Sequence, residues 1–424
     1  MPTLEHIPHV THLSQSAGSG GAAIAAMRLL RASVAAGQSA DMIVAGHRKE
    51  TLNEGGVRVT TLPFKRSLRR TIGRKRNRAL LRADTRDEIL SLGLIRSGRL
   101  AAINALSDRI LNLHWINFDT ISIREIGRIR HPLVWTLHDM WAFSGAVHYS
   151  EDPDWRTGYS TRPRDDLDRR VWREKQRAWC TPMQIVTPSR WLADCVRQSA
   201  LMSEWPVEVI PNAIDLSIWA PMPQVNARAA LGVPPDAQVI AFGAMGGDSD
   251  PRKGFTYLQD ALNRLRSAGR EVTLLIFGSD RGSSDLPFTA RYMGVLDDPD
   301  DLRRVYAAAD VFALPSRQDN LPNVGVEALA CGTPIVGFDI GGLPDLVPSR
   351  DVGALAKPFD AGDLAAALAV VLDRQRGAGA GSGPSAMAQA ARAHAAESYA
   401  APIVAANYAN LYERVFEGTH RDAY

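Results

Sequence analysis

Two carboxylates with seven residues between them are the strongest candidates for chemistry in this chain. Asp319 lies in a polar loop, and Glu327 lies inside the apolar segment that follows the loop. Carboxylate oxygens accept hydrogen bonds from hydroxyl groups, whereas two carboxylates beside a phosphate would repel it. The pair is therefore predicted to bind sugar hydroxyls on either side of a phosphate, and not to hold the phosphate itself.

The residues around the acids predict a strand, a loop, a helix and a second strand. Residues 311–314 and 335–338 are apolar runs, and the helix between them begins near Pro322 and ends at Gly332. In a parallel α/β sheet this unit places its loop and helix N-terminus at the carboxyl edge of the strands, where phosphate is favoured. The residues of the predicted helix start are Asn320, Leu321, Pro322, Asn323 and Val324.

Other residues nearby match a known motif in type and spacing. They are Pro315, Ser316, the loop of residues 318–322, Ala328, residues 331–334, Gly341 and Gly342. With the two acids they resemble the acidic-x7-acidic signature of retaining glycosyltransferases of family 4, in particular bacterial exopolysaccharide enzymes of the colanic-acid type. The resemblance implies that Asp319 binds the donor sugar and that Glu327 binds the ribose of the nucleotide. The family usually has glutamate first, so Asp319 shortens the reach by one methylene.

Basic side chains in the same half could neutralise a leaving diphosphate. A predicted strand at residues 239–242 is followed by a glycine-rich turn, then by Arg252 and Lys253. Cations at this place would stabilise the negative charge that grows as a diphosphate departs. In the family an arginine and a lysine do this; Lys253 matches the lysine, while Ala244 stands where the arginine is usual and Arg252 is a candidate substitute. The resemblance also implies donor contacts at Gly278 and Met293.

The first half of the chain has candidates at two further strand ends. His138 and Asp139 follow a predicted strand at residues 133–137, a class of crevice position similar to that of Asp319. His138 could donate a hydrogen bond while Asp139 orients its ring, or His138 could be a core or capping histidine. The resemblance implies that His138 contacts the donor sugar near the reacting carbon.

A glycine pair follows the first predicted strand, at residues 9–13. Gly20 and Gly21 precede an alanine-rich helix, but the G-x-G-x-x-G spacing of dinucleotide-binding folds is absent. The family resemblance implies that such a pair lets the backbone approach the donor diphosphate. A tight turn between strand and helix explains the pair equally well, and both demands can be met at once.

A strongly basic segment lies between Lys65 and Arg82, where nine residues are Lys or Arg and none is acidic. Each basic residue near an anionic surface contributes about 1 kcal/mol, so the segment could hold the protein reversibly at an anionic membrane. A pyrophosphate-linked acceptor and an ordinary solvated surface are the alternatives. Nucleic acid is disfavoured, because the interspersed residues are aliphatic more than aromatic.

The totals of the chain agree with a cytoplasmic enzyme. Its 424 residues, 45% of them apolar, suit two or three domains. Three widely spaced cysteines match neither a zinc pattern nor a disulfide framework and favour a reducing cytosol. The sequence has no apolar signal core and no apolar run long enough to span a membrane, so we expect a cytoplasmic protein, with association at the inner face of the plasma membrane through the basic segment.

The resemblance implies the GT-B architecture, an α/β fold of two facing Rossmann-like domains with an interdomain cleft. The expected acceptor-side domain is residues 1–205, completed by a C-terminal helix at 400–424, and the expected nucleotide-sugar-binding domain is residues 206–399. The implied reaction is retaining transfer, without metal or other cofactor, from a UDP- or GDP-sugar to a glycan or lipid-linked saccharide in exopolysaccharide or cell-surface polysaccharide biosynthesis. A sugar-nucleotide epimerase and a non-catalytic nucleotide-sugar-binding subunit are the alternatives.

Overall fold

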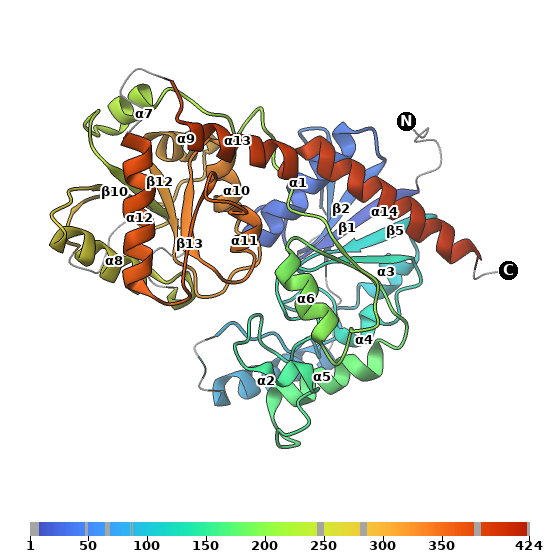
Figure 1. The fold of residues 1–424 in the computed structure, drawn as a ribbon. Coiled ribbons are helices and arrows are strands. Elements are labelled where there is room, and N and C mark those ends of the chain that lie inside the picture. Colours follow the sequence, from blue (N-terminus) through green and yellow to red (C-terminus); the bar gives the residue numbers. More distant parts are fainter. Residues whose placement is uncertain are drawn as a thin grey trace. The chain divides into compact units, whose positions relative to one another are not determined.

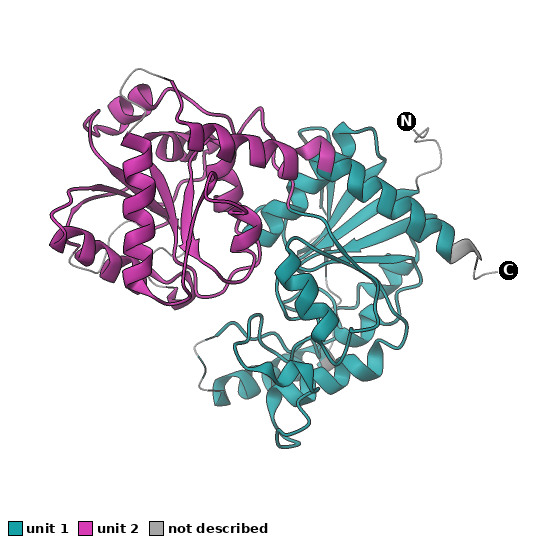
Figure 2. Ribbon diagram, viewed as in Figure 1, with its two compact units in different colours: residues 1–211, 404–424 teal, residues 212–403 magenta. Residues whose placement is uncertain are grey.

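The chain divides into two compact units (Figure 2). A computed structural model describes residues 8–46, 50–63, 68–84, 86, 88–243, 250–279, 286–376 and 383–421. The first unit comprises residues 1–211 and 404–424, and the second comprises residues 212–403. The domain boundary predicted from the sequence is near Trp205, and the prediction assigns residues 400–424 to the first domain.

The described residues of the first unit contain an eight-stranded sheet of order β3-β4-β2-β1-β5-β6-β7-β8 (Figure 1). Neighbouring strands are parallel except β3 and β4, which are antiparallel. The strands are β1 His9–Ser14, β2 Ala40–Gly46, β3 Glu50–Glu54, β4 Val57–Pro63, β5 Arg109–Leu113, β6 Leu133–Thr136, β7 Gln184–Thr187 and β8 Val207–Val209. The helices are α1 Gly21–Ala35, α2 Leu68–Ala83, α3 Leu100–Asn104, α4 Ile123–Ile126, α5 Leu167–Ala178, α6 Arg190–Gln198 and α14 Ala401–Arg421, with a short 3₁₀ helix at Pro153–Arg156.

The last helix, α14, packs on the sheet of the first unit. The apolar side chains Val404, Tyr408, Leu411 and Tyr412 of this helix are buried, whereas Ile403 is exposed. The phenol groups of the two tyrosines reach polar side chains in the middle of the sheet. Asn112 Nδ2 donates to Tyr412 Oη at 2.7 Å, and Thr136 Oγ1 lies 3.0 Å from Tyr408 Oη. The chain end therefore satisfies polar groups of β5 and β6 that are buried under it.

The second unit is built on a parallel sheet of order β11-β10-β9-β12-β13-β14. Its strands are β9 Val239–Gly243, β10 Thr273–Phe277, β11 Thr289–Tyr292, β12 Val311–Leu314, β13 Ile335–Phe338 and β14 Gly353–Ala356. Its helices are α7 Gln224–Leu231, α8 Phe255–Ser267, α9 Pro299–Ala308, α10 Asn323–Ala330, α11 Leu343–Leu346, α12 Ala361–Arg376 and α13 Ala386–Tyr399, with a 3₁₀ turn at Pro251–Lys253.

Helices cover both faces of this second sheet, which explains why its strands read as continuous apolar runs. In β12, Phe312 and Leu314 join one core cluster with residues of α9, α10 and α13. Val311 and Ala313 point to the opposite face and join a second cluster with residues of α8 and α12. The unit is thus a three-layer α/β domain.

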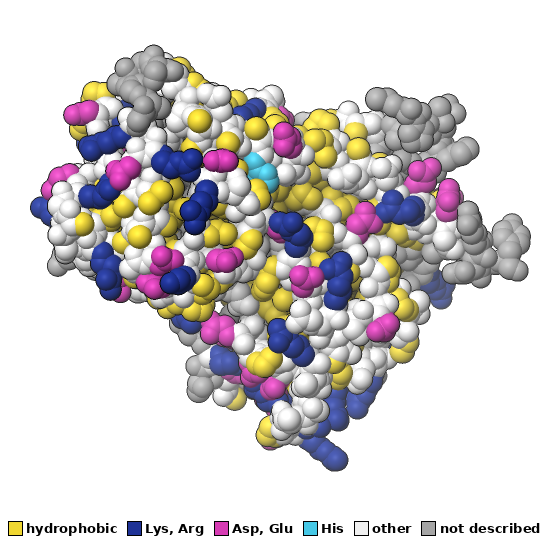
Figure 3. All heavy atoms as spheres, in the orientation of Figure 1, with side chains coloured by type: hydrophobic (Ala, Val, Ile, Leu, Met, Phe, Trp, Pro, Cys, Tyr) yellow, Lys and Arg dark blue, Asp and Glu magenta, His cyan; other side chains and the backbone are white. Residues whose placement is uncertain are grey.

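Basic and acidic side chains are interspersed with apolar ones on the face of the molecule drawn in Figure 3, in keeping with a net charge of only +3. Among the helices that the structure describes, none has the length and apolar character needed to cross a membrane. The predicted basic segment forms α2 from Leu68 onward, while Lys65 and Arg66 lie outside the described residues. On this helix Leu68 and Ile72 are 77% and 58% exposed.

Candidate active site

The candidate residues of the second unit lie where its strand order reverses. The chain runs from β9 outward through β10 to β11 on one side, and from β12 outward through β13 to β14 on the other. The loops that leave β9 and β12 therefore diverge from adjacent strands, which creates the crevice where open α/β sheets bind ligands. Lys253 follows β9, and Asp319 follows β12.

Asp319 is surrounded by the basic residues that the sequence singled out. Its Oδ2 atom lies 2.7 Å from Lys253 Nζ and 3.8 Å from the guanidinium of Arg252. The backbone N–H of Asn320 donates to its Oδ1 at 3.1 Å, and Ser316 Oγ lies 3.4 Å from Oδ2. Burial alone would raise the pKa of Asp319, but the charges of Lys253 and Arg252 with these hydrogen bonds outweigh it and hold the pKa below its usual value. The side chain is therefore a buried, paired carboxylate.

Two glycines lock the backbone of this loop against its neighbours. Gly254 has φ +69°, and a Cβ there would overlap the carbonyl oxygen of Pro315. Gly341 has φ +55°, and a Cβ there would overlap the carbonyl oxygen of Asp319, which accepts a hydrogen bond from the N–H of Gly342 at 3.0 Å. Both positions need glycine for conformation and for close approach. The glycines that the sequence motif contains thus fix the main chain on both sides of the carboxylate.

Arg252 holds the same loop from the other side. Its guanidinium donates to the carbonyl of Gln318 at 3.1 Å and pairs with Asp250 at 3.2 Å, while its own carbonyl accepts from the N–H of Arg317 at 2.8 Å. Arg252 therefore positions the Asp319 loop as well as contributing positive charge beside it. The family's arginine position, Ala244, lies outside the described residues.

The second acid points into the core of the unit. Glu327 lies within α10, is 5% exposed, and accepts a hydrogen bond from Tyr306 Oη at 3.0 Å. Helix α10 begins at Asn323 with Pro322 at its N-cap, and no side chain in the described part of the protein caps it. Asn320, Leu321 and Val324 complete the predicted helix start, of which Asn320 and Leu321 are buried. The amides of this first turn are oriented as an anion site requires.

The two weaker donor-site matches, Gly278 and Met293, lie together at the end of β10. Gly278 has φ +90°, and its N–H donates to the carbonyl of Gly294 at 2.7 Å. The N–H of Met293 donates to Ile276, also at 2.7 Å. Both residues are thus at the carboxyl edge of the sheet, as the sequence predicted for a loop that contacts a ligand.

In the first unit the strand order also reverses, between β1 and β5, and the candidate glycine pair follows β1. Gly20 is the N-cap of α1 with φ +93°, a conformation that only glycine adopts readily, and Gly21 is the first helical residue. Among the residues that the structure describes, no side chain caps the helix, and no heavy atom lies within 4 Å of a Cβ built at Gly20. The tight turn between strand and helix is therefore real, and it leaves open space at the helix start.

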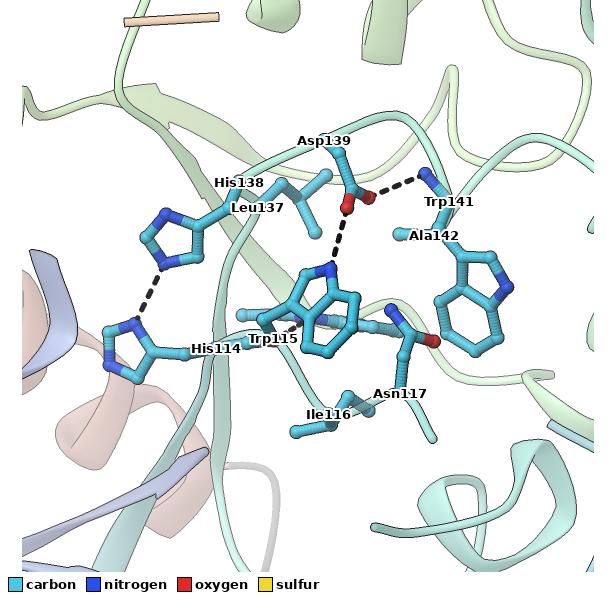
Figure 4. A pocket seen from close by; sticks show the side chains of 10 residues that line it. His114, Trp115, Ile116, Asn117, Leu137, His138, Asp139, Trp141 and Ala142 are labelled. Carbon is cyan, nitrogen blue, oxygen red and sulfur yellow. Dashed lines mark hydrogen bonds between the residues drawn. The ribbon is translucent and has the colours of Figure 1, made fainter. Parts of the chain in front are cut away.

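His138 lies beside a small pocket at the carboxyl end of β6, which Figure 4 shows. The expectation that Asp139 orients the ring of His138 is wrong for the contacts that the structure gives. The carboxylate of Asp139 accepts from Trp115 Nε1 at 2.8 Å, from the N–H of Trp141 at 2.9 Å and from His148 Nδ1 at 2.6 Å. His138 Nε2 instead lies 3.1 Å from Nδ1 of His114. Because the carboxylate of Asp139 points to Trp115, Trp141 and His148, it does not orient the ring of His138.

Asp139 therefore organises the loop that follows the strand. Burial would raise the pKa of Asp139, but the charge and hydrogen bond of His148, with the donors Trp141 and Trp115, lower it below its usual value. His148 in turn lies 2.8 Å from Ser91 Oγ through its Nε2 atom. The carboxylate is the fixed centre of this network.

Lys175 supports this loop, although nothing in the sequence singles it out. Its buried ammonium donates to the carbonyls of Trp141, Ser144 and Gly145 and lies 3.9 Å from the centre of the Trp141 ring. Burial holds the pKa of Lys175 well below its usual value. On helix α5 its spacing resembles that of any amphipathic helix, so only the fold reveals that it ties the loop after His138 together.

Comparisons with known proteins agree with this division of the chain. Residues 19–218 match the family described as "Glycosyltransferase Family 4", and residues 237–374 match the family described as "Glycosyl transferases group 1". Both halves of the chain are therefore similar to glycosyltransferase domains. The first match covers the first unit from α1 through β8, and the second covers the Lys253 and Asp319 loops of the second unit.

Several curated proteins that are similar to this chain have the same name. D-inositol 3-phosphate glycosyltransferase of Segniliparus rotundus is 37% identical over 161 residues, which are 35% of each chain. The enzyme of the same name from Mycobacterium sp. strain JLS is 32% identical over 282 residues, 62% of this chain and 57% of the relative. The chain thus spans between about a third and 57% of the length of these relatives.

Solved structures share the fold at low sequence identity. Sucrose-phosphate synthase from Thermosynechococcus elongatus matches with a TM-score of 0.69 and 17% identity, covering 97% of this chain and 99% of that chain. Anabaena HepE in complex with UDP and glucose matches with a TM-score of 0.64 and 18% identity, covering 95% and 99%. Two Rossmann-like sheets with flanking helices, as in these proteins, confirm the predicted α/β fold of the GT-B class.

Proposed function

We propose that the protein is a retaining glycosyltransferase that takes a sugar from a nucleotide-sugar donor without the help of a metal ion. The observation that carries this proposal is the Lys253–Asp319 pair at the crevice of the second unit, 2.7 Å apart and next to the start of α10. A cation for a diphosphate and a carboxylate for a sugar hydroxyl are needed side by side, because diphosphate and sugar are bonded to each other in the donor.

In this proposal each residue has one role. Lys253, Arg252 and the amides at the start of α10 stabilise the diphosphate as it leaves, and Gly20 and Gly21 let the backbone of α1 approach it. Asp319 and His138 hold the donor sugar, and Glu327 accepts a hydrogen bond from the ribose. The leaving phosphate takes the proton of the acceptor hydroxyl, so the reaction needs no separate base. Gly278 and Met293 border the base.

The donor is proposed to be a UDP-sugar, with a GDP-sugar as the alternative. Support comes from the fold neighbour HepE, whose structures hold UDP, UDP-glucose, or UDP with glucose. For the acceptor, the names of the curated relatives favour an inositol phosphate. A lipid-linked saccharide of exopolysaccharide assembly is the second candidate, and the basic helix α2 with its exposed Leu68 and Ile72 favours it, since such a helix suits an anionic membrane surface.

A two-stage experiment tests the function. A thermal-shift panel of UDP, GDP and ADP sugars identifies the donor, since a ligand at 100 times its dissociation constant stabilises the folded state by about 2.7 kcal/mol. Transfer is then measured with that donor, using inositol 3-phosphate in one arm and a lipid-linked saccharide in the other. A product in either arm with retained anomeric configuration supports the proposal and identifies the acceptor class.

The other outcomes of this experiment separate the alternatives. Conversion of the donor without any acceptor would show a sugar-nucleotide epimerase. Binding of donor with neither conversion nor transfer would favour a non-catalytic subunit, and the absence of binding to any nucleotide sugar would overturn the proposal.

A further inference from the structure

Three histidines at the carboxyl edge of the first sheet form a hydrogen-bonded chain. His12 Nδ1 lies 2.9 Å from His114 Nε2, and His114 Nδ1 lies 3.1 Å from His138 Nε2. Their rings are stacked, with centroids 5.2 and 5.4 Å apart and interplanar angles of 26° and 29°. The outer pair is drawn in Figure 4, where the dashed line joins His114 to His138. Each contact uses one specific nitrogen of each ring.

The strand register builds this chain step by step. His12 on β1 is opposite Asn112 of β5, so His114 lies two positions further along. Leu113 is opposite Trp135 of β6, so the position that corresponds to His114 is Thr136. His138 lies two residues beyond Thr136. Side chains two residues apart share one face of a sheet, and the three rings therefore form a diagonal row on the same face.

All three rings are expected to be neutral at neutral pH. Burial lowers the pKa of His12 to about 4 and that of His114 well below its usual value. Burial also lowers the pKa of His138 to about 4, against the opposing charge of Asp139. A neutral imidazole has one N–H donor and one bare acceptor nitrogen. The two contacts between the rings can therefore be made in only two proton orders.

The surroundings of His12, at the inner end of the histidine row, distinguish between these two proton orders. Within the part of the chain that the structure describes, Nε2 of His12 is buried and has no hydrogen-bond partner. If His12 carried its proton there, a buried N–H donor would be orphaned, which is rarer than an unsatisfied acceptor. The favoured order puts the proton of His12 on Nδ1, where it is donated to His114. His114 then donates from Nδ1 to Nε2 of His138, and the proton of His138 is on Nδ1.

We propose that His12 and His114 are positioning residues that fix His138 as the neutral Nδ1–H tautomer, and that this N–H is the donor for a hydroxyl of the sugar. The role of His138 rests on the proposed function, whereas its tautomer does not. A neutral donor suits this place because positive charge grows on the sugar ring as the leaving group departs, and an imidazolium would repel it. The free imidazole prefers its proton on Nε2, so the hydrogen bonds from His12 through His114 hold His138 in the tautomer that is intrinsically less stable.

The tautomer is measured on the full-length protein with ¹⁵N-labelled histidine, without substrate, in long-range ¹H–¹⁵N correlation spectra at neutral pH. The signals of His138 are assigned by their loss in His138→Gln. The wild type is expected to have the proton on Nδ1 of His138. His12→Asn keeps an amide donor at the position of Nδ1 and is expected to leave the proton of His138 on Nδ1, whereas His12→Leu removes the donor and is expected to move that proton toward Nε2.

Two results would overturn the proposal: a proton on Nε2 of His138 in the wild type, or the same His138 tautomer in His12→Leu as in the wild type. If His12→Leu does not fold, the tautomer of His138 in the wild type and in His12→Asn still tests the proposal. In transfer assays His12→Leu is expected to lower kcat about tenfold, the order of one lost hydrogen bond, with little change in the KM for donor. A wild type without transfer activity would refute the proposed function while the tautomer result stands.

Discussion

Lys253 makes the closest charged contact with Asp319, so the proposed chemistry is tested first at this residue. Lys253→Ala removes a cation at 2.7 Å from the buried carboxylate and, in the proposed mechanism, from the leaving diphosphate. We expect kcat to fall by about two orders of magnitude, the usual loss when one charge-stabilising group is removed. The matched control is Lys357→Ala, an exposed lysine of the same unit, which is expected to keep wild-type turnover. Wild-type turnover in Lys253→Ala would remove the lysine from the mechanism.

Glu327 is tested by removing its proposed partner from the ligand. If the carboxylate accepts a hydrogen bond from the ribose, Glu327→Ala should weaken binding of the cognate nucleoside diphosphate by about 10- to 100-fold, the value of a hydrogen bond to a charged group. The same substitution should have little effect on the 2′- or 3′-deoxy nucleotide that lacks the contacted hydroxyl. Calorimetric titration of both proteins with the ribo, the 2′-deoxy and the 3′-deoxy ligand measures the coupling. Equal losses for the ribo and both deoxy ligands would show that Glu327 acts only through its contact with Tyr306.

At the scale of elements, the close approach of two loops depends on Gly254. Gly254→Ala would bring a Cβ onto the Pro315 carbonyl and push the Lys253 turn away from the loop of Asp319, so we expect a loss of both stability and kcat/KM. Gly269→Ala is the matched control, because Gly269 also has positive φ, +75°, but a Cβ there has nothing within 4 Å. It should cost only the strain of the left-handed conformation, about 1–2 kcal/mol. Similar melting temperatures and activities for the two variants would contradict the argument.

The elements themselves were largely predictable. The strands at residues 311–314 and 335–338 are observed with those bounds as β12 and β13. Ser189, a residue type common at N-caps, caps α6, since its hydroxyl accepts from the N–H of Leu192. Both faces of β12 and β13 are buried, so the apolar pattern carries a strong signal. The C-terminal helix predicted at 400–424 is observed as α14, and a turn at Ala400 separates it from α13.

The contacts between elements were less predictable. The partners of Asp139 and the row of His12, His114 and His138 depend on which strands are neighbours and in what register. A period-two pattern gives the face of each side chain but neither the strand order nor the register. His12 also looks like any polar residue within a strand when it is taken from the sequence alone. The motif with Asp319 was easier, because its residues are close in sequence.

At the scale of the whole molecule, the buried histidines predict how stability responds to acid. The pKa of His12 is about 4 in the folded protein and about 6.5 when unfolded, so the unfolded chain binds more protons between these values. The free energy of unfolding must therefore fall as pH falls through this window. For His12 alone the loss between pH 8 and pH 5 is about 2 kcal/mol, and His114 adds to it in the same direction. Carboxylates with lowered pKa, such as Asp319, lose their contribution only at lower pH.

The measurement can be confined to the first unit, because the sequence has nine tryptophans and only Trp219 lies outside residues 1–211. Urea unfolding followed by tryptophan fluorescence at pH 8, 6.5 and 5 gives the free energy of that unit at each pH. His12→Leu should lose stability less steeply than the wild type on acidification, by about 2 kcal/mol between pH 8 and pH 5, because one proton-binding group of the unfolded chain has been removed. Parallel pH dependences of the two proteins would mean that His12 is not held neutral by the fold, and the proton order drawn from its burial would then have no basis.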